Sequence, residues 1–368
     1  MNSPVSFELS LWQKRQATVL YHYASLDYLK GLKLRVDALI NGTDVLLDTA
    51  QQQGRDALVA SKRWGARDTS ANWSTYGFPA LMDFQQTTAW DISQRAFENY
   101  GITGANQCAR MLQELSMGWA TEEEEEVFNE RLEAVVRYAG SIDGIMRRPP
   151  TEDDFSLWLE WRDIQAQYPR LPKFKVRTDV QAEADKIPPR TGVYVPQDDP
   201  YGSLQFRWTG GNLGDMCDTY TFNEVGLDLL QTVGRDALWG DEEALFAFIR
   251  QPKYAGVFCD LAGQEIEESK YAAGASAAKA FTHNACRWYF VELVNDEYED
   301  PDAGGSDATA VLRIPAGNSV PRPGYWFTPA KQGSRRYFKR GDTFPVIEGS
   351  SYGATFWQWS SDQSLPSL

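Results

Sequence analysis

The first half of the chain alternates apolar and polar positions with the period of an α-helix. From the N-terminus, large side chains recur at steps of three and four residues, which is the spacing of one face of an amphipathic helix. These positions are Leu9, Trp12, Gln16, Val19, Tyr23, Leu26 and Leu29. The pattern predicts a helix that ends at Asn41–Gly42, followed by a second helix over residues 44–60. A turn-rich loop that holds Trp73 and Tyr76 is predicted over residues 65–79. Further helices are predicted over 79–100 and 104–118.

A run of five glutamates, Glu122–Glu126, follows Thr121. Thr121 and Glu124 have the spacing of a capping box, in which each side chain binds the backbone N–H of the other residue. The negative charges also fall at the positive end of the helix dipole. The sequence therefore predicts a helix that starts here. Helix stabilisation alone explains the run, and binding of a partner is the alternative.

Two stretches of the second half, residues 189–208 and 321–339, have the pattern of β-hairpins and resemble each other. Pro-Arg-x-Gly opens both, at Pro189 and at Pro321, and a β-forming run follows each glycine. In each copy the glycine lies 14 residues before a phenylalanine that precedes a basic residue, namely Phe206 and Phe338. The repetition predicts two related hairpins in one β-rich unit.

The remaining pattern indicates the α+β class. Strands are expected at 287–294, 311–314 and 355–359, with an acidic loop at 295–305 and a few helices before residue 280. Residues 169–192 carry Pro, Lys and Arg and are the expected connector. We therefore predict a helical domain at 1–175, followed by an α+β domain at 188–368 with hairpins near 190–208 and 321–339. Packing of the two as one unit stays open.

The charge balance limits the class of partner. The chain of 368 residues has 36 Lys and Arg against 51 Asp and Glu, for a net charge of −15. Nucleic acids and anionic membranes select basic surfaces, so the sequence argues against both as partners. A basic protein partner remains compatible. Solubility alone is the simpler explanation of the acidic surface.

No sequence motif indicates an enzyme, a metal site or a cofactor. The chain lacks the glycine-rich phosphate loops, the zinc-protease motif and the nucleophile elbow that mark common active sites. Its four cysteines are scattered and it has only two histidines, which argues against structural zinc and for reduced thiols. His283 and Cys286 have the spacing of neighbours on a helix face, but a core cysteine beside a half-buried histidine is the simpler interpretation. We expect no cofactor and no catalytic residue.

The hairpin residues carry a resemblance to a known group of proteins. RTGVYVPQDDPYGSLQFRWTGG, followed by FNEVGLDLLQTVGRDALW, resembles immunity protein families 71 and 72 of bacterial polymorphic toxin systems. The tail AGNSVPRPGYWFTPAKQGSRRYFKRGDTFP, followed by YGATFWQW, is similar to their C-terminal pattern, with Val320 where that pattern has a cysteine. The likeness covers most of residues 188–240 and 314–360, and more loosely the helical first half.

The resemblance implies a cytoplasmic antitoxin that binds and neutralises a cognate toxin effector, one delivered by type VI secretion. The absence of a signal peptide and of an 18-residue apolar run agrees with a cytoplasmic protein. From the charge we infer a basic nuclease as the toxin, blocked by acidic side chains around aromatic anchors. The candidate partner-binding residues lie in three acidic clusters: Asp296, Glu297, Glu299, Asp300 and Asp302; Asp198 and Asp199; and the glutamate run with Glu122, Glu123 and Glu126.

Two other functions remain open at this point. The first is an enzyme that reverses the toxin's modification, which would require a deep pocket with a strongly shifted acid or base. The second is an effector chaperone or adaptor, which would bind outside the toxin's active site and leave the toxin active. Oligomeric state and the identity of the toxin are open as well.

Overall fold

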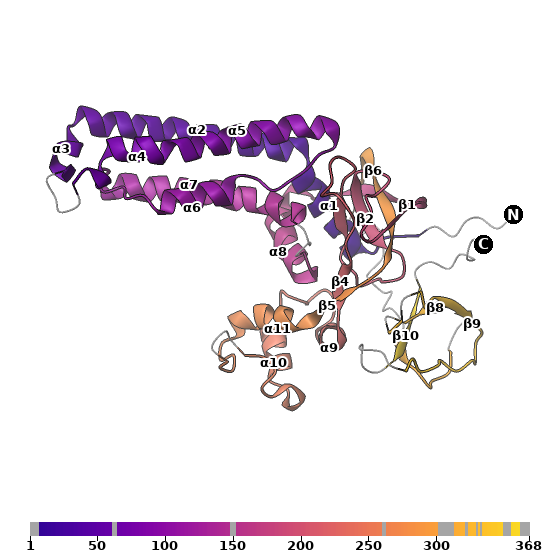
Figure 1. The fold of residues 1–368 in the computed structure, drawn as a ribbon. Helices are drawn as coiled ribbons and strands as arrows, with labels where there is room; N and C mark the ends of the chain where they lie inside the picture. Colours follow the sequence, from indigo (N-terminus) through magenta and orange to yellow (C-terminus); the bar gives the residue numbers. More distant parts are fainter. Residues whose placement is uncertain are drawn as a thin grey trace. The chain divides into compact units, whose positions relative to one another are not determined.

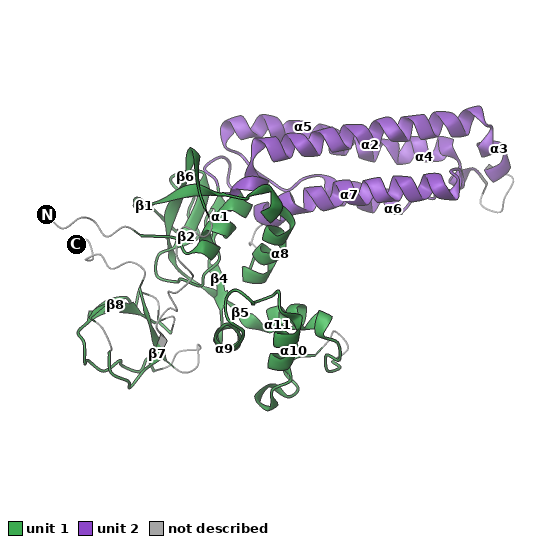
Figure 2. Ribbon diagram, turned by 180° about the vertical axis from the view of Figure 1, so that it is seen from behind, with its two compact units in different colours: residues 1–20, 151–207, 215–368 green, residues 21–150, 208–214 purple. Residues whose placement is uncertain are grey.

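The computed structural model describes residues 7–60, 65–147, 152–259, 263–300, 313–320, 323–328, 330–331, 333–348 and 355–360. The chain divides into two compact units, coloured separately in Figure 2. Residues 21–150 and 208–214 form the helical unit, and residues 1–20, 151–207 and 215–368 form the sheet unit. The expected domains, 1–175 and 188–368, differ from these units in three segments: residues 1–20 and 151–175 belong with the sheets, and residues 208–214 belong with the helices. The α+β class, with a helical first half and a sheet-rich second half, is confirmed.

Long helices dominate the helical unit. Helix α1 (Leu11–Ala24) begins in the sheet unit and ends in this one. The unit then contains α2 (Leu26–Gln52), α3 (Arg55–Ala60), α4 (Ser70–Tyr76), α5 (Phe78–Gln94), α6 (Ala105–Gln113) and α7 (Glu122–Met146). Figure 1 shows α2 lying beside α5, and α2 also packs against α7. None of the described helices is both long and apolar enough to cross a membrane.

Helix α2 is continuous where two helices were expected. Its N-cap is Ser25, whose Oγ accepts a hydrogen bond from the Tyr28 backbone N–H at 3.1 Å. Its buried positions keep the three- and four-residue spacing across Gly42, with Ile40 and Thr43 on either side. A glycine inside a helix costs only about 1 kcal/mol relative to alanine, and core packing along the whole length outweighs that cost. The predicted end at Asn41–Gly42 was therefore wrong.

The expected loop at 65–79 contains helix α4. Its N-cap is Thr69, whose Oγ1 accepts a hydrogen bond from the Asn72 backbone N–H at 3.2 Å. Trp73 is 1% exposed and meets the rings of Trp119 and Phe128 edge-on, at centroid distances of 5.8 and 5.6 Å. Burial of this one large side chain holds a short polar segment as a helix. The loop assignment was wrong because it weighed composition and not this long-range contact.

The first sheet has four antiparallel strands in the order β1-β6-β2-β3. The strands are β1 (Leu171–Glu183), β2 (Gly192–Pro196), β3 (Gln205–Arg207) and β6 (Arg287–Glu299). Strand β1 occupies much of the stretch that was expected to be a connector. It lies at an edge of the sheet, and its Lys and Arg side chains suit an exposed edge. The first residues of the expected acidic loop form the last part of β6. The connector and the loop were therefore both assigned wrongly, because β1 and β6 pair with each other.

A second sheet has the same topology. Its strands are β7 (Arg313–Pro315), β8 (Gly324–Phe327), β9 (Arg336–Phe338) and β10 (Phe356–Trp359), in the order β7-β10-β8-β9. In both sheets the fourth strand in sequence lies between the first and the second, and all pairs are antiparallel. Both predicted hairpins are present, as β2–β3 and β8–β9. The sequence echo therefore extends to a repeated four-strand module.

A small layer of helices and strands separates β3 from β6 in the chain. It contains β4 (Thr219–Phe222), α9 (Glu224–Val233), α10 (Glu242–Ile249), α11 (Ala272–Ala280) and β5 (Phe281–Asn284), with β4 and β5 paired. Its core is rich in aromatic rings, including Phe222, Trp239 and Phe248. This layer is an insertion that the second module lacks.

A buried carboxylate joins three segments of the sheet unit. Asp154, the first residue of α8 (Asp154–Ile164), is 3% exposed. It accepts hydrogen bonds from the indole N–H groups of Trp12 at 2.6 Å and Trp239 at 2.7 Å. The Arg235 guanidinium lies 2.9 Å from both carboxylate oxygens and supplies the opposing charge. One side chain thus connects α1, α8 and the segment between α9 and α10.

Removal of that carboxylate should strongly destabilise the sheet unit. Asp154→Ala leaves a half-buried guanidinium and two indole N–H groups without their acceptor, and we expect a loss of about 3 kcal/mol in the free energy of unfolding. Asp163→Ala, on the exposed side of the same helix, is the matched control and should change stability by less than about 0.5 kcal/mol. Urea unfolding followed by tryptophan fluorescence measures both. Equal stability of the two variants would show that Asp154 does not join these segments.

The glycines that open the two hairpins should resist substitution. Gly192 and Gly324 have φ values of 149° and 151°, a backbone conformation that side chains with a Cβ rarely adopt. We expect Gly192→Ala and Gly324→Ala each to destabilise the sheet unit by about 1–3 kcal/mol. Gly274→Ala, inside α11 with open space around the added methyl group, should instead stabilise it by about 0.5–1 kcal/mol. Thermal unfolding measures the melting temperature of each variant. A change of the same sign in all three melting temperatures would contradict the account.

Candidate protein-binding face

The acidic cluster at the end of β6 is paired with basic side chains of its own unit. Glu297 lies 2.7 Å from Lys173, and Glu299 lies 2.5 Å from Lys14. Asp300 contacts Arg170 at 3.5 Å. Asp296 belongs to the same strand, and Asp302 lies outside the described residues. Because bases of α1, β1 and the turn before β1 face these carboxylates, the cluster presents less negative charge than its sequence suggests.

The turn at Asp198–Asp199 is divided between the surface and the core. Asp199 is 4% exposed and accepts hydrogen bonds from the Tyr201 backbone N–H, the Thr221 hydroxyl and the Asn284 amide, at 3.0, 3.1 and 3.0 Å. Burial raises the pKa of this carboxyl, and these hydrogen bonds oppose the rise. Asp199 is therefore a structural residue without a surface to offer a partner, which corrects its place among the candidates. Asp198 lies 4.0 Å from Arg287.

The glutamate run opens α7, as predicted, with Glu122–Glu125 in the first turn and Glu126 directly after it. Thr121 Oγ1 accepts from the Glu124 backbone N–H at 3.3 Å, and Glu124 Oε2 accepts from the Thr121 backbone N–H at 2.9 Å. Both halves of the capping box are thus present. Arg55 of α3 also holds Glu124, with Nη2 donating to Oε1 at 3.1 Å. These hydrogen bonds, Arg55 first, hold the pKa of Glu124 below its ordinary value.

The other candidates of the run point to solvent. Glu122, Glu123 and Glu126 are exposed, and within the described part of the chain no basic side chain pairs with them. The first three turns of α7, residues 122–133, hold seven glutamates and a single base, Arg131. This cluster keeps three exposed carboxylates without an ion pair in the described structure, whereas among the described acids at the end of β6 Asp296 alone does so.

A groove of about 290 Å³ lies directly beside this acidic turn, between α2 and α7. Its lining from α2 is Leu39, Gly42, Thr43 and Leu46, and its lining from α7 is Glu123, Glu124, Val127, Phe128 and Arg131. Four of these residues, Leu39, Leu46, Val127 and Phe128, have apolar side chains, and Val127 is 43% exposed. Sequence reasoning found the acidic residues but missed the groove, because the groove depends on how two distant helices face each other.

The seam between α2 and α7 is closed at its other end by two tyrosines. The rings of Tyr28 and Tyr138 stack at 4.0 Å, and each hydroxyl donates to the backbone carbonyl of the other residue, at 3.2 and 3.0 Å. Arg35 lies 3.9 Å above the Tyr138 ring. Gly31 provides the space for Tyr138, since a Cβ there would collide with its hydroxyl. At Gly42 the one described side-chain atom near the position of an added Cβ is the Arg131 Nη1, and the groove remains beside it.

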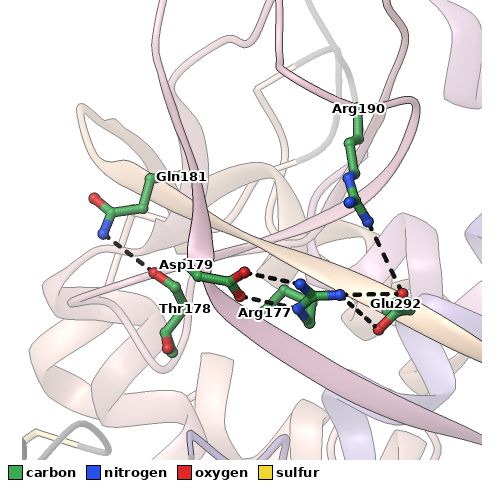
Figure 3. A network of polar contacts seen from close by, with 6 residues as sticks. All are labelled: Arg177, Thr178, Asp179, Gln181, Arg190 and Glu292. Carbon is green, nitrogen blue, oxygen red and sulfur yellow. Dashed lines mark hydrogen bonds and ion pairs between the residues drawn. The ribbon is translucent and has the colours of Figure 1, made fainter.

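Charges on the first sheet form a closed network (Figure 3). Arg177 donates to both carboxylate oxygens of Asp179, at 2.9 and 2.8 Å, and to Glu292 at 3.2 Å. The Arg177 guanidinium lowers the pKa of Asp179 to about 2. Arg190, which precedes strand β2, lies 3.9 Å from Glu292 and forms a structural ion pair with it. Its counterpart Arg322 lies outside the described residues.

The remaining candidates for chemistry, His283 and Cys286, lie in and just after a strand and not on the helix face that their spacing suggested. His283 belongs to strand β5, and its ring lies 4.1 Å from that of Tyr220. Burial raises the pKa of Cys286 well above its ordinary value, which disfavours the thiolate. Among the residues that the structure describes, His, Cys, Asp and Glu side chains form no group of three that could hold a metal ion.

One carboxyl in the helical unit has a strongly shifted pKa. Burial raises the pKa of Asp91 to about 6, and its Oδ2 has no hydrogen-bond partner within the described structure. Arg95, whose guanidinium lies 3.8 Å from the Tyr100 ring, opposes the shift. Asp91 lines neither the groove nor a smaller cavity of about 90 Å³ beside Tyr254 in the sheet unit. A shifted acid and a cavity are therefore not found together at this position.

Comparison with known proteins adds no relative: no family model, no curated protein and no solved structure matches this chain. The resemblance to immunity proteins stays a prediction from the hairpin and tail residues.

The ion pair of Glu124 with Arg55 should give α7 a measurable pH dependence. Glu124→Gln keeps a capping-box side chain but removes the charge that faces Arg55. We expect it to lower the free energy of unfolding at pH 7 by about 1–2 kcal/mol. Because the folded-state pKa is lowered, this contribution is present above the ordinary pKa of 4.5 and is lost as the pH falls through the lower folded-state value.

The matched control is Glu122→Gln, which removes one charge from the same helical turn without touching Arg55. Its effect should stay below about 0.5 kcal/mol at pH 7. Urea unfolding of both variants at pH 7 and pH 3 measures the difference. A loss in Glu124→Gln that is equally large at both pH values would contradict an ionic origin.

Proposed function

We propose that this chain is a cytoplasmic antitoxin that binds and neutralises a toxin effector from a polymorphic toxin system. The observation that carries the proposal is the exposed acidic turn of α7, where Glu122, Glu123 and Glu126 border an apolar groove. Apolar surface bordered by charge is the usual composition of a protein-binding face. The hairpin likeness to immunity families 71 and 72 supports the same function.

Charge gives the proposed partner its character. A toxin that cleaves or modifies nucleic acid needs a basic cleft for phosphate groups, and an acidic face fits such a cleft. The net charge of −15 would also speed the encounter with a basic protein by electrostatic steering. Neutralisation by occlusion then requires only that the acidic face cover the toxin's active site. No catalytic group of the antitoxin is needed.

The helical unit also offers aromatic side chains of the kind that anchor interfaces. Tyr76, Trp90 and Phe97 are 61, 62 and 72% exposed. Large exposed aromatic residues are enriched among the residues that dominate binding energy. They support the proposal that this unit, in addition to its acidic turn, takes part in recognition.

Co-expression with the product of a neighbouring gene tests the function. The expected result is that the neighbouring protein is toxic to a susceptible cell, that this chain restores growth, and that the two proteins co-purify. Restored growth without a complex would indicate an enzyme that reverses the damage. A complex in which the toxin keeps its activity in vitro would indicate a chaperone or adaptor. Absence of rescue would contradict the antitoxin function.

Reversal of the acidic turn tests the role of charge. Glu122→Lys, Glu123→Lys and Glu126→Lys together change the net charge by six, from −15 to −9. We expect slower association with the toxin by about tenfold or more, and a weaker salt dependence of the association rate. Stopped-flow kinetics at several salt concentrations measure both quantities.

A control variant with the same net charge separates local from global effects. Glu242→Lys, Glu243→Lys and Glu267→Lys reverse three exposed acids of the sheet unit, two of them in the first turn of α10. This variant should associate at close to the wild-type rate. If both triple variants slow association equally, the total charge matters and the acidic turn has no special role.

A further inference from the structure

The groove between α2 and α7 has the form of a site for protruding apolar side chains. Leu39 and Leu46 of α2 face Val127 and Phe128 of α7 across it. Its volume of about 290 Å³ lies at the lower end of the range for ligand pockets. A site of this size and lining suits one or two apolar side chains of a protein better than a large cofactor.

Two small residues of α2 create the open space. Gly42 carries no side chain, and Thr43 is buried with its hydroxyl donating to the Leu39 carbonyl at 2.8 Å. A Cβ placed on Gly42 would meet only the end of the Arg131 side chain, at 2.9 Å. The groove floor at this point is therefore exposed helix backbone and the flexible side chain that lies over it.

The charges beside the groove define what its occupant must carry. The lining holds Glu123, Glu124 and one base, Arg131, and Glu126 and Glu130 continue the acidic surface along α7. An occupant with Lys or Arg next to its apolar residues would place positive charge against these carboxylates. A basic amphipathic helix has apolar side chains on one face and basic side chains at the edges of that face. Amphipathic helices bind other proteins by placing their apolar face in an apolar groove.

We propose that the α2–α7 groove receives a basic amphipathic helix of the toxin, with one or two of its apolar side chains inserted beside Gly42. This inference rests on the proposed function for the identity of the partner. It adds the place of docking and the chemical character of the segment that docks. The acidic residues of α7 then select the partner and orient it, while the groove supplies the buried contact.

A synthetic peptide tests the groove without the toxin. The probe is a fluorescein-labelled 18-residue peptide of Leu and Lys with the leucines on one helical face, and the reference is a scrambled peptide of the same composition. Fluorescence anisotropy with the full chain at 150 mM salt gives the dissociation constants. We expect the amphipathic peptide to bind about tenfold or more tightly than the scrambled one, because only the former presents a continuous apolar face.

Two pairs of matched variants locate the binding. Gly42→Leu fills the groove, whereas Gly140→Leu places the same side chain on the exposed surface of α7, where a Cβ has open space. Gly42→Leu should weaken peptide binding by about tenfold or more, since the inserted apolar contact is lost. Gly140→Leu should bind as the wild type does. Circular dichroism and thermal unfolding show whether both variants keep the fold.

The second pair excludes simple attraction of a cationic peptide to an acidic protein, and it also decides the question if Gly42→Leu does not fold. Val127→Glu lies in the groove lining, and Val45→Glu lies on α2 outside it, with 43 and 67% of the valine side chains exposed. Both substitutions add the same charge. Val127→Glu should weaken binding despite that charge, and Val45→Glu should not. Equal binding by the two variants, or equal binding of the two peptides, would overturn the groove as a docking site.

The toxin assay then separates the two proposals. Gly42→Leu should lose rescue and co-purification, while Gly140→Leu should keep both. If the wild type and Gly42→Leu protect equally well, the antitoxin function stands and the groove is not its docking site. If the wild type gives no protection, the antitoxin function fails, and the peptide measurements still decide whether the groove binds a basic amphipathic helix.

Discussion

The carboxylate of Glu124 is the contact on which the acidic face of the helical unit depends. One of its oxygens accepts the Thr121 backbone N–H and so closes the capping box, while Arg55 of α3 holds the carboxylate from the other side. The start of α7 is therefore fixed both within its own turn and against a neighbouring helix. This leaves Glu122, Glu123 and Glu126 on the exposed side of a firmly positioned turn, next to the groove. Glu124 thus stabilises the turn, and Glu122, Glu123 and Glu126 remain exposed for the proposed contact with a partner.

The sheet unit follows a different principle, which is repetition. Two four-stranded antiparallel sheets have the same strand order, and each hairpin opens with a glycine whose φ lies near 150°. The repeat is not identical in detail, because Gly192 pairs with Arg207 and Gly324 pairs with Phe338, a difference of one residue in register. The first module also carries the insertion with α9, α10 and α11 between its third and fourth strands. Asp154 fastens that insertion to α1 and α8 through Trp239 and Arg235.

Local signals in the sequence predicted the elements that depend on local chemistry. The capping box at Thr121 and the paired hairpins followed from residue types at fixed short spacing. Features that depend on distant partners could not be predicted in the same way. The segment that was expected to be a loop forms α4 because Trp73 packs on Trp119. The expected connector forms β1 because it pairs with β6. The same distinction holds for the candidate site. The exposure of Glu122 could be predicted from the sequence. The burial of Asp199 and the ion pair of Glu297 with Lys173 could not, because both depend on the fold.

The start of α7 and the groove beside it are the proposed binding site for the toxin. Hydrogen exchange of the full chain, alone and in complex with the proposed toxin partner, tests this binding because it reports protection along the whole chain in one measurement. The account predicts slower exchange in the complex for amides of residues 39–46 and 122–131, with little change in residues 287–299. Protection confined to residues 287–299, with α2 and α7 unchanged, would contradict it.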